Sequence, residues 1–238
     1  MSAPDPRRVA AADEAVDRYV RDGMRLGLGT GSTATLMLDA LAARLRSGAL
    51  RDIAGVPTSE ATAAACRRLG IPLLTLAECS QLDVVIDGAD EIDPGLDLIK
   101  GLGGAHLREK VVARAGRLMV VVADDQKLVA HLGERVPLPV EVVTFALPVC
   151  DRLLRDLGWA PTRRMRADAQ PFVTDEGNAI LDCRRDDWSE PAVLAAGVRE
   201  LPGVVEHGFF LGIAAAAVVG TPAGVRVLER GSLPAAAP

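Results

Sequence analysis

The residues best suited to chemistry lie in three short stretches, and one of them carries four carboxylates within seven positions. Asp87, Asp90, Glu91 and Asp93 follow an apolar Val-Val-Ile run that is typical of a buried strand. Sheets of parallel strands place their sites at the carboxyl ends of those strands. Carboxylates this close repel one another unless a ligand neutralises them. A divalent cation such as Mg²⁺ would do so, as would a polyol that donates hydrogen bonds; a solvated turn without a ligand is the third interpretation.

The second stretch is a Gly-rich turn at residues 27–34, GLGTGSTA, which predicts an anion site. Its glycines let the backbone approach a ligand, and the helix expected after it offers free N–H groups. Phosphate is the leading candidate because hydroxyls accompany the glycines at Thr30, Ser32 and Thr33. The spacing also fits a loose dinucleotide fingerprint, but the second strand ends at residues 55–58 without the acidic residue that such a site requires. An NAD(P)-dependent oxidoreductase is therefore an alternative, and a tight turn without a ligand is another.

The third stretch, residues 100–110, reads KGLGGAHLREK and places a lysine before a second Gly-rich turn. Glu109 is expected about one turn into the helix that follows. Only three of the 27 basic Lys and Arg residues are lysines, and all three fall within one window of 28 residues: Lys100, Lys110 and Lys127. Because a compact ammonium differs from a planar guanidinium, these lysines are candidates for point charges with specific roles.

Composition excludes several classes of protein. The chain has 238 residues, a net charge of −5 and 49% hydrophobic residues, which favours a globular protein and disfavours a nucleic-acid or anionic-membrane surface. The longest apolar run, residues 209–220, is too short to cross a bilayer, and the N-terminus has no signal-peptide pattern. Four widely spaced cysteines, expected to be reduced, favour a cytoplasmic location; they are Cys66, Cys79, Cys150 and Cys183.

Strands and helices alternate along the first half of the chain. Continuous apolar strands separated by helices predict a parallel sheet covered on both faces. Ser59 and Gly70 are the expected caps of the helix at residues 60–69. The other helices are expected at 9–20, 34–45 and 105–115, and the strands at 24–28, 53–56, 72–76, 83–87 and 118–123.

After residue 130 the pattern changes to that of a small α+β domain. Residues 137–140 predict a linker-like break, and the turn at residues 175–178 predicts a hairpin. Helices are expected at 149–157 and 191–198, and strands at 141–144, 162–166, 172–173, 179–183 and 204–210, before the chain returns to the main sheet at 213–219 and 225–228 and ends in a frayed tail at 232–238. Residues 1–131 plus 208–238 are thus predicted to form the main domain, and residues 132–207 the inserted one.

The motifs taken together resemble the A-type ribose-5-phosphate isomerases. They occur in that family's order over nearly the whole chain, at residues 29–34, 59–62, 87–92, 100–104, 108–110, 137–141, 175–178 and 220–222. The resemblance implies an α/β fold, with a Rossmann-like parallel sheet domain and an inserted smaller α+β (ferredoxin-like) domain. It also implies a homo-oligomer (a homodimer or a tetramer) that interconverts ribose 5-phosphate and ribulose 5-phosphate in the non-oxidative branch of the pentose phosphate pathway, without metal or cofactor.

The same resemblance implies a set of site residues. Glu109 corresponds to the proton acceptor, and Leu102 stands where many members have Gly or Arg. The implied substrate contacts are Thr30, Gly31, Ser32 and Thr33; Asp87, Gly88, Ala89 and Asp90; Lys100, Gly101, Leu102 and Gly103; and Lys127.

Aldose–ketose exchange makes its own physical demands on such a site. The proton moves between C1 and C2 through an enediolate, so the reaction needs a base, for which a Glu with raised basicity serves, and a cation such as Lys100 that stabilises the oxyanion. Ribose 5-phosphate is mainly a furanose, so a further acid/base group must open the ring; Asp87 or a water is expected to do this. A non-catalytic sugar-phosphate sensor is the remaining alternative, although no DNA-binding element is apparent.

Overall fold

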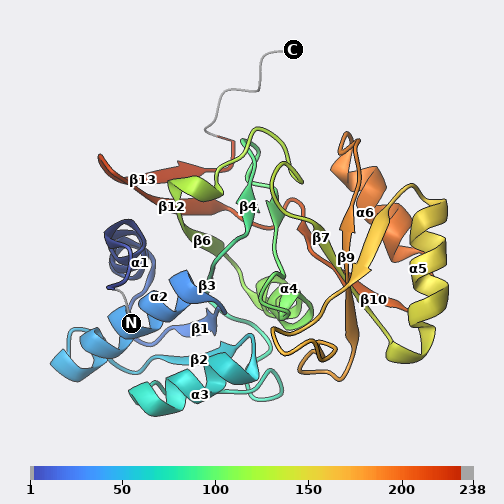
Figure 1. Ribbon diagram of the computed structural model, residues 1–238. Coiled ribbons are helices and arrows are strands. Elements are labelled where there is room, and N and C mark those ends of the chain that lie inside the picture. Colours follow the sequence, from blue (N-terminus) through green and yellow to red (C-terminus); the bar gives the residue numbers. More distant parts are fainter. Residues whose placement is uncertain (1–2, 232–238) are drawn as a thin grey trace.

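A six-stranded sheet organises the first and last parts of the chain (Figure 1). The computed structural model describes residues 3–231, so the predicted tail at 232–238 lies outside the described residues. The strand order is β13-β12-β6-β3-β1-β2, and every neighbouring pair is parallel except β12 with β13. The strands are β1 (Arg25–Leu28), β2 (Ala54–Pro57), β3 (Val84–Asp87), β6 (Met119–Asp124), β12 (Ala216–Thr221) and β13 (Gly224–Glu229).

Helices cover both faces of this sheet. The helices α1 (Pro6–Tyr19), α2 (Ser32–Ser47) and α3 (Glu60–Leu69) share one apolar core with the sheet. The helix α4 (His106–Ala115) lies on the other face, where its Val112 packs with Val85 and Val56. The alternation of apolar strands and amphipathic helices therefore folds as the sequence predicts.

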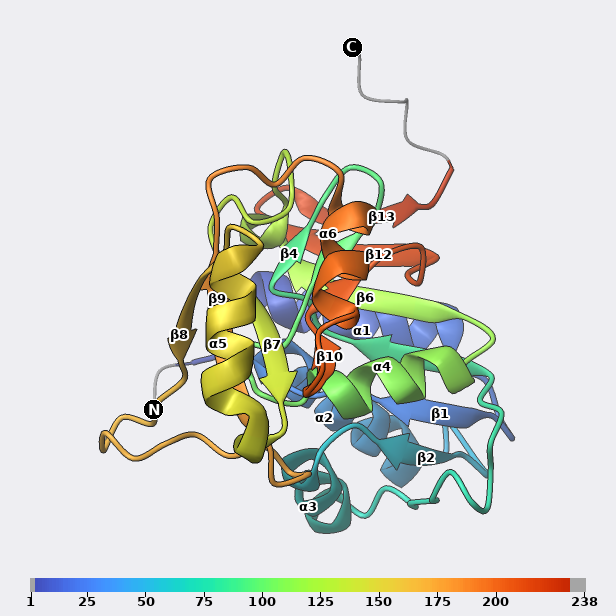
Figure 2. The same ribbon diagram turned by 90° about the vertical axis from the view of Figure 1, so that its right-hand side faces the viewer.

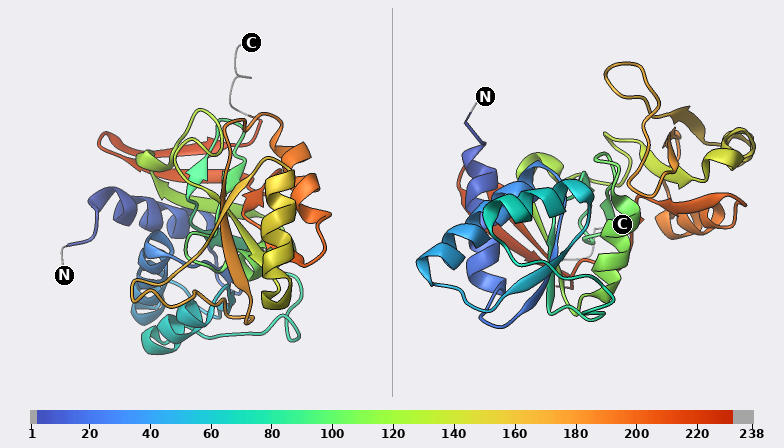
Figure 3. Two further views of the ribbon diagram at one scale, coloured as in Figure 1. Left: turned by 45° about the vertical axis from the view of Figure 1, so that its right-hand side comes forward. Right: turned by 90° about the horizontal axis from the view of Figure 1, so that it is seen from below.

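A separate antiparallel sheet carries the second half of the chain, and it stands to one side of the central sheet in Figures 1 and 3. Its order is β10-β7-β9-β8, and α5 (Leu147–Asp156) and α6 (Pro191–Arg199) lie side by side against it (Figure 2). The strands are β7 (Leu138–Val142), β8 (Ala160–Arg163), β9 (Ala179–Arg184) and β10 (Val204–His207). This arrangement confirms the α/β class with a mainly parallel central sheet and a small antiparallel one; the predicted boundaries at residues 132 and 207 stay predictions.

A third, short sheet connects the two larger ones. It contains β4 (Glu91–Ile92), β5 (Leu98–Ile99) and β11 (Phe209–Phe210), and the 3₁₀ turns η1 (Asp125–Lys127) and η2 (Thr144–Ala146) complete the elements of the described residues. β11 follows β10 of the small sheet almost directly, and β5 runs into the Gly-rich turn before α4. No helix within residues 3–231 has the length and apolarity that a membrane span requires.

Local chemistry explains several element ends. Ser59 caps α3 because its Oγ accepts the Thr62 N–H at 3.0 Å, and Gly70 ends the helix in the left-handed conformation, as both residues predict. The first helix begins at Pro6, earlier than the predicted residue 9. Asp5 caps it, and proline is tolerated at a first helical position because its missing N–H is not needed there.

Two strand predictions and one predicted break are wrong. Residues 72–76 form only one bridge, Leu73 to Gly55, because Pro72 has no N–H to offer a ladder. Residues 172–173 form no strand; the only pairing there is a bridge between Met165 and Pro171. Residues 138–140 of the predicted break belong to β7 instead, where Pro139 lies just beyond the last β10 pair, His207 with Val140.

Replacing Ser59 with alanine tests the cap of α3. The substitution removes the acceptor for the Thr62 N–H and leaves the Thr30 hydroxyl without one of its partners. We expect a loss of about 1–2 kcal/mol in the free energy of unfolding, measured in urea. Ser47→Ala, at an exposed position, is the matched control and should change that free energy by less than about 0.5 kcal/mol. Equal effects of the two substitutions would contradict this account of the helix start.

Candidate active site

Four segments meet at one edge of the central sheet. β3 lies between β1 and β6, all three are parallel, and their carboxyl ends therefore open at the same edge. The loop before α4 comes in from β5 beside them. Together these segments enclose a small cavity of about 90 Å³ that is lined by Thr30, Gly31, Ser32, Thr33, Gly88, Ala89, Asp90, Lys100, Gly101, Gly103, Glu109 and Lys127. Of the residues implied by the family resemblance, only Asp87 and Leu102 do not line this cavity.

The centre of the site is an ammonium between two carboxylates. Lys100 Nζ lies 3.2 Å from Asp87 Oδ2 and 3.3 Å from Glu109 Oε2, and it donates a hydrogen bond to the Gly88 carbonyl at 2.6 Å. All three charged side chains are at most 5% exposed. Among the described residues, neither of the two carboxylate oxygens that face the ammonium has a well-formed hydrogen bond. Both can therefore still accept a proton or a hydrogen bond.

Burial and charge shift the pKa values of this cluster. Burial raises the pKa of Glu109 to about 8; the Lys100 ammonium opposes that rise and the Asp87 carboxylate adds to it. Burial also raises the pKa of Asp87 against the opposing charge of Lys100. For Lys100, burial alone would lower the pKa, but the two carboxylates outweigh it and hold the pKa above its ordinary value. One cation thus faces two acids, so one of the acids retains its proton near neutral pH.

Backbone N–H groups hold the Asp87 carboxylate in place. Its Oδ1 accepts the N–H groups of Thr30 at 3.0 Å and Gly88 at 2.7 Å. A Cβ at Gly29 would come within 2.2 Å of this oxygen, so the close approach of the two loops requires glycine there. Asp87 consequently touches Lys100 rather than the cavity.

The other carboxylates of the acidic stretch turn in different directions. Asp90 Oδ2 accepts the Leu102 N–H at 2.9 Å, and Asp93 Oδ1 accepts the Asp97 N–H at 2.8 Å. Glu91 is buried and accepts N–H groups from three residues, Gly133, Arg135 and Val136. Backbone donors and Lys100 thus relieve the repulsion that the sequence poses, and within the described chain these carboxylates do not converge as one ligand set.

The Gly-rich turn at residues 29–33 forms one wall of the cavity. Ser32 and Thr33 begin α2. The N-cap residue of this helix is Gly31, with a φ of 105°, and no side chain caps the helix start. Lys127 reaches the same wall from η1. The Thr30 hydroxyl, by contrast, lies within 2.7–2.9 Å of the hydroxyls of Thr58, Ser59 and Thr62, so it joins β1 to α3 and is not free for a ligand.

Arg8 is a neighbour of this wall that sequence reasoning missed. It extends from α1, donates from Nη1 to Ser32 Oγ at 3.1 Å and pairs through Nε with Asp124 Oδ2 at 2.5 Å. Asp124 ends β6 at the same edge of the sheet, a position that could have marked it from sequence. No local sequence motif marks Arg8 as a site residue. Only the packing of α1 against β6 and β12 brings it to the cavity wall.

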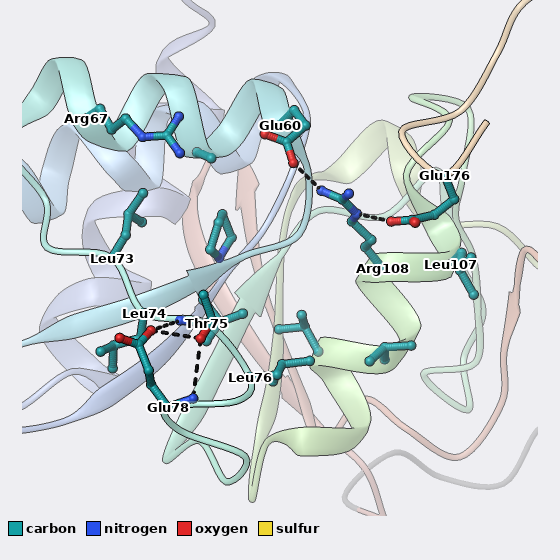
Figure 4. A pocket seen from close by; sticks show the side chains of 15 residues that line it. Glu60, Arg67, Leu73, Leu74, Thr75, Leu76, Glu78, Leu107, Arg108 and Glu176 are labelled. Atoms are coloured by element: carbon teal, nitrogen blue, oxygen red, sulfur yellow. Dashed lines mark hydrogen bonds and ion pairs between the residues drawn. The ribbon is translucent and has the colours of Figure 1, made fainter.

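A larger cavity of about 690 Å³ lies elsewhere, between α3, α4 and residues 73–78 (Figure 4). It contains none of the site residues that the sequence predicts, and its walls are mainly aliphatic. Figure 4 shows Arg108 between Glu60 and Glu176, with which it forms ion pairs, so the carboxylates at this rim are already neutralised. The groups suited to proton transfer are in the smaller cavity.

Fold and site together define an α/β enzyme in which a buried carboxylate and a buried ammonium face a small polar cavity beside a helix N-terminus. The model of the family "Ribose 5-phosphate isomerase A (phosphoriboisomerase A)" matches residues 54–224. The chain belongs to this family.

Relatives of known name and structure support that membership. The ribose-5-phosphate isomerase A of Roseiflexus sp. (strain RS-1) is 57% identical over 92% of this chain and 93% of its own. That of Methylorubrum extorquens is 50% identical over 97% and 100%. A D-ribose-5-phosphate isomerase solved with phospho-erythronic acid superposes with a TM-score of 0.92 at 35% identity, covering 96% of this chain and 100% of its own. The enzyme from Plasmodium falciparum also gives 0.92, at 36% identity over 96% and 100%.

A carboxyl titration of Glu109 tests the electrostatics of the cavity. In protein labelled with ¹³C at the glutamate Cδ, we expect Glu109 to titrate near pH 8 because of its burial. Lys100→Met should raise this pKa further, since the ammonium lowers it, and Asp87→Asn should lower it. The exposed Glu60, whose pKa is lowered by its hydrogen bond to Arg108, is the internal control. Titration of Glu109 at an ordinary value near 4 would contradict the geometry.

Proposed function

We propose that the protein interconverts D-ribose 5-phosphate and D-ribulose 5-phosphate through an enediolate, with Glu109 as the base and Lys100 as the cation that stabilises the intermediate. Ribose 5-phosphate isomerisation, a step of the pentose phosphate pathway, is the activity of the family to which the chain belongs. The observation that carries the assignment of roles is the contact of 3.3 Å between these two buried side chains at the wall of one cavity.

Glu109 has the basicity that the proton transfer requires. A general base is most effective when its pKa lies near the working pH, and burial raises the pKa of Glu109 to about 8. The carboxylate would take the proton from one sugar carbon and return it to the next. Its position in the first turn of α4 and its burial hold it in one place for both steps.

Lys100 supplies charge where the oxyanion develops. The carboxylates beside it raise its pKa, so the side chain stays charged throughout the working range. A preorganised cation in a site that excludes water stabilises a developing anion far better than water does. When an enediolate oxygen approaches, the ammonium can share its charge between the substrate and Asp87.

Ring opening needs a second acid/base group, for which Asp87 is the predicted residue. Its Oδ2 lies next to Lys100 and lacks a hydrogen bond within the described chain, which suits a group that exchanges a proton. Asp87 lies behind Lys100, however, whereas Asp90 lines the cavity. With Asp87 as the ring-opening group, Asp90 would bind the sugar hydroxyls; transfer through a water molecule is the alternative route for ring opening.

The phosphate is assigned to the wall formed by Ser32, Thr33 and Lys127. The N-terminal amides of α2 and the positive end of its dipole favour an anion there. Arg8 adds a second cation next to Ser32. The solved relative bound to phospho-erythronic acid, itself a phosphorylated sugar acid, is consistent with such a ligand at this kind of site. With the phosphate held here, the reacting carbons would extend toward Glu109.

The oligomeric state and the cellular location expected from the sequence remain predictions. A homo-oligomer, in particular a homodimer, and a cytoplasmic location are predictions that follow from the family resemblance and the composition. The two alternatives, an NAD(P)-dependent oxidoreductase and a non-catalytic sensor, are not favoured by the family to which the chain belongs.

Glu109→Gln is the direct test of the base. We expect kcat for ribose 5-phosphate to fall by about 10³-fold or more, because an amide cannot accept the proton, while the Kd for phospho-erythronic acid changes only a few-fold. Glu60→Gln, at an exposed glutamate outside the cavity, is the matched control and should retain wild-type kcat. Turnover of the Glu109 variant at a rate close to wild type would remove this residue from the role.

Lys100→Arg separates charge from shape. Arginine keeps the positive charge, but its planar guanidinium cannot take the place of an ammonium that contacts two carboxylates and a carbonyl in a space only 3% exposed. We expect kcat to fall on the order of 10²-fold, the range for loss of one oxyanion-stabilising group. Thermal unfolding of the variant serves as the control for its fold. An unchanged kcat would contradict the need for a compact cation.

A further inference from the structure

Arg164 reaches from the small sheet to the Gly-rich loop of the cavity. It follows directly after β8, and its Nη1 donates to the carbonyl of Gly101 at 2.7 Å and to that of Leu102 at 2.9 Å. These carbonyls belong to the loop that joins Lys100 to α4. The Arg164 side chain is only 10% exposed, so water does not replace these hydrogen bonds easily.

The guanidinium is itself held in a fixed orientation. Asp182 on β9 binds it with both carboxylate oxygens, one of them at 2.9 Å from Nε. The Phe172 ring lies 5.8 Å from the guanidinium carbon, and the same ring packs closely on Gly104 at the end of the loop. The Asp182 carboxylate and the Phe172 ring thus leave the Arg164 guanidinium little freedom.

These bonds determine which way the loop peptides face. In a trans peptide the C=O and the following N–H point in opposite directions. The Gly101–Leu102 peptide therefore directs its carbonyl to Arg164 and its N–H to Asp90 Oδ2, at 2.9 Å. The next peptide likewise turns its carbonyl to Arg164, so the Gly103 N–H points away from the arginine, and Gly103 is one of the residues that line the cavity.

We propose that Arg164 is a positioning residue for the isomerase reaction: it fixes the peptides of residues 101–103 so that the Gly103 N–H and the Asp90 carboxylate face the substrate. The inference rests on the proposed function, because it requires that the cavity bind the sugar phosphate. Arg164 does not line the cavity and acts only through the loop. The effect falls on the part of the substrate next to Lys100 and Glu109, since the phosphate wall at Ser32 and Lys127 belongs to other loops.

The test compares the binding of two ligands, phospho-erythronic acid and inorganic phosphate, in the variant Arg164→Met. This substitution keeps an unbranched side chain as far as the ε position and removes the guanidinium donors. We expect kcat/KM for ribose 5-phosphate to fall about 10- to 100-fold and the Kd for phospho-erythronic acid to rise about tenfold. The Kd for inorganic phosphate should stay within twofold, because its wall does not depend on Arg164. Arg164→Lys, which keeps a charged donor, should recover part of the loss.

Arg155→Met is the matched control. Arg155 also binds a carboxylate, Asp151, with Nε at 2.9 Å and a carbonyl, that of Pro161, at 3.1 Å, but it lies on α5 away from the loop. The kinetics of the Arg155→Met variant should equal those of the wild type. If Arg164→Met fails to fold, Asp182→Asn serves instead: it loosens the guanidinium while keeping its donors, and it should weaken phospho-erythronic acid binding and spare that of phosphate.

Two results would overturn the inference. In one, Arg164→Met keeps kcat/KM within twofold of the wild type. In the other, both ligands lose affinity equally, which indicates general damage to the site. Neither result touches the proposed function as long as Glu109→Gln is inactive, whereas an active Glu109→Gln variant would remove the proposed function whatever Arg164 does.

Discussion

The site depends on one buried ammonium that two buried carboxylates share. Lys100 lies 3.2 and 3.3 Å from Asp87 and Glu109, and all three side chains are almost completely buried. Removing one charge from such a group leaves the others uncompensated in a medium of low polarity, which costs several kcal/mol. Burial raises the pKa of Glu109 into the range in which a carboxylate can both take and return a proton, and the Asp87 carboxylate adds to that rise.

The topology of the chain brings these charges together. Asp87 ends the strand in the middle of the parallel sheet, whereas Lys100 and Glu109 stand on either side of the Gly-rich loop that leads from the short third sheet into α4. Backbone donors of two neighbouring loops hold Asp87, and Arg164 of the small sheet holds the loop after Lys100. The small sheet is thereby connected to the site through hydrogen bonds, although none of its residues lines the cavity.

Features written in local sequence could be predicted, and those that depend on distant contacts could not. The cap at Ser59, the stop at Gly70 and the position of the acidic stretch at a strand end follow from neighbouring residues alone. The direction of the Thr30 hydroxyl, the position of Asp87 behind Lys100 and the approach of Arg8 and Arg164 arise between segments far apart in the chain. No periodicity or motif encodes such pairs, because each requires the packed sheet before its partners meet. Pro139 is the opposite case. A proline by itself predicts a break, but this one lies in β7, whose pairing does not need the N–H that proline lacks.

Neutron diffraction from crystals of the deuterated protein at pH 7 tests the shared ammonium most directly, because it locates the protons of the cluster. We expect three deuterons on Lys100 Nζ and a single deuteron shared by the Asp87 and Glu109 carboxylates. A neutral Lys100 amine, or two carboxylates without a deuteron between them, would contradict this expectation.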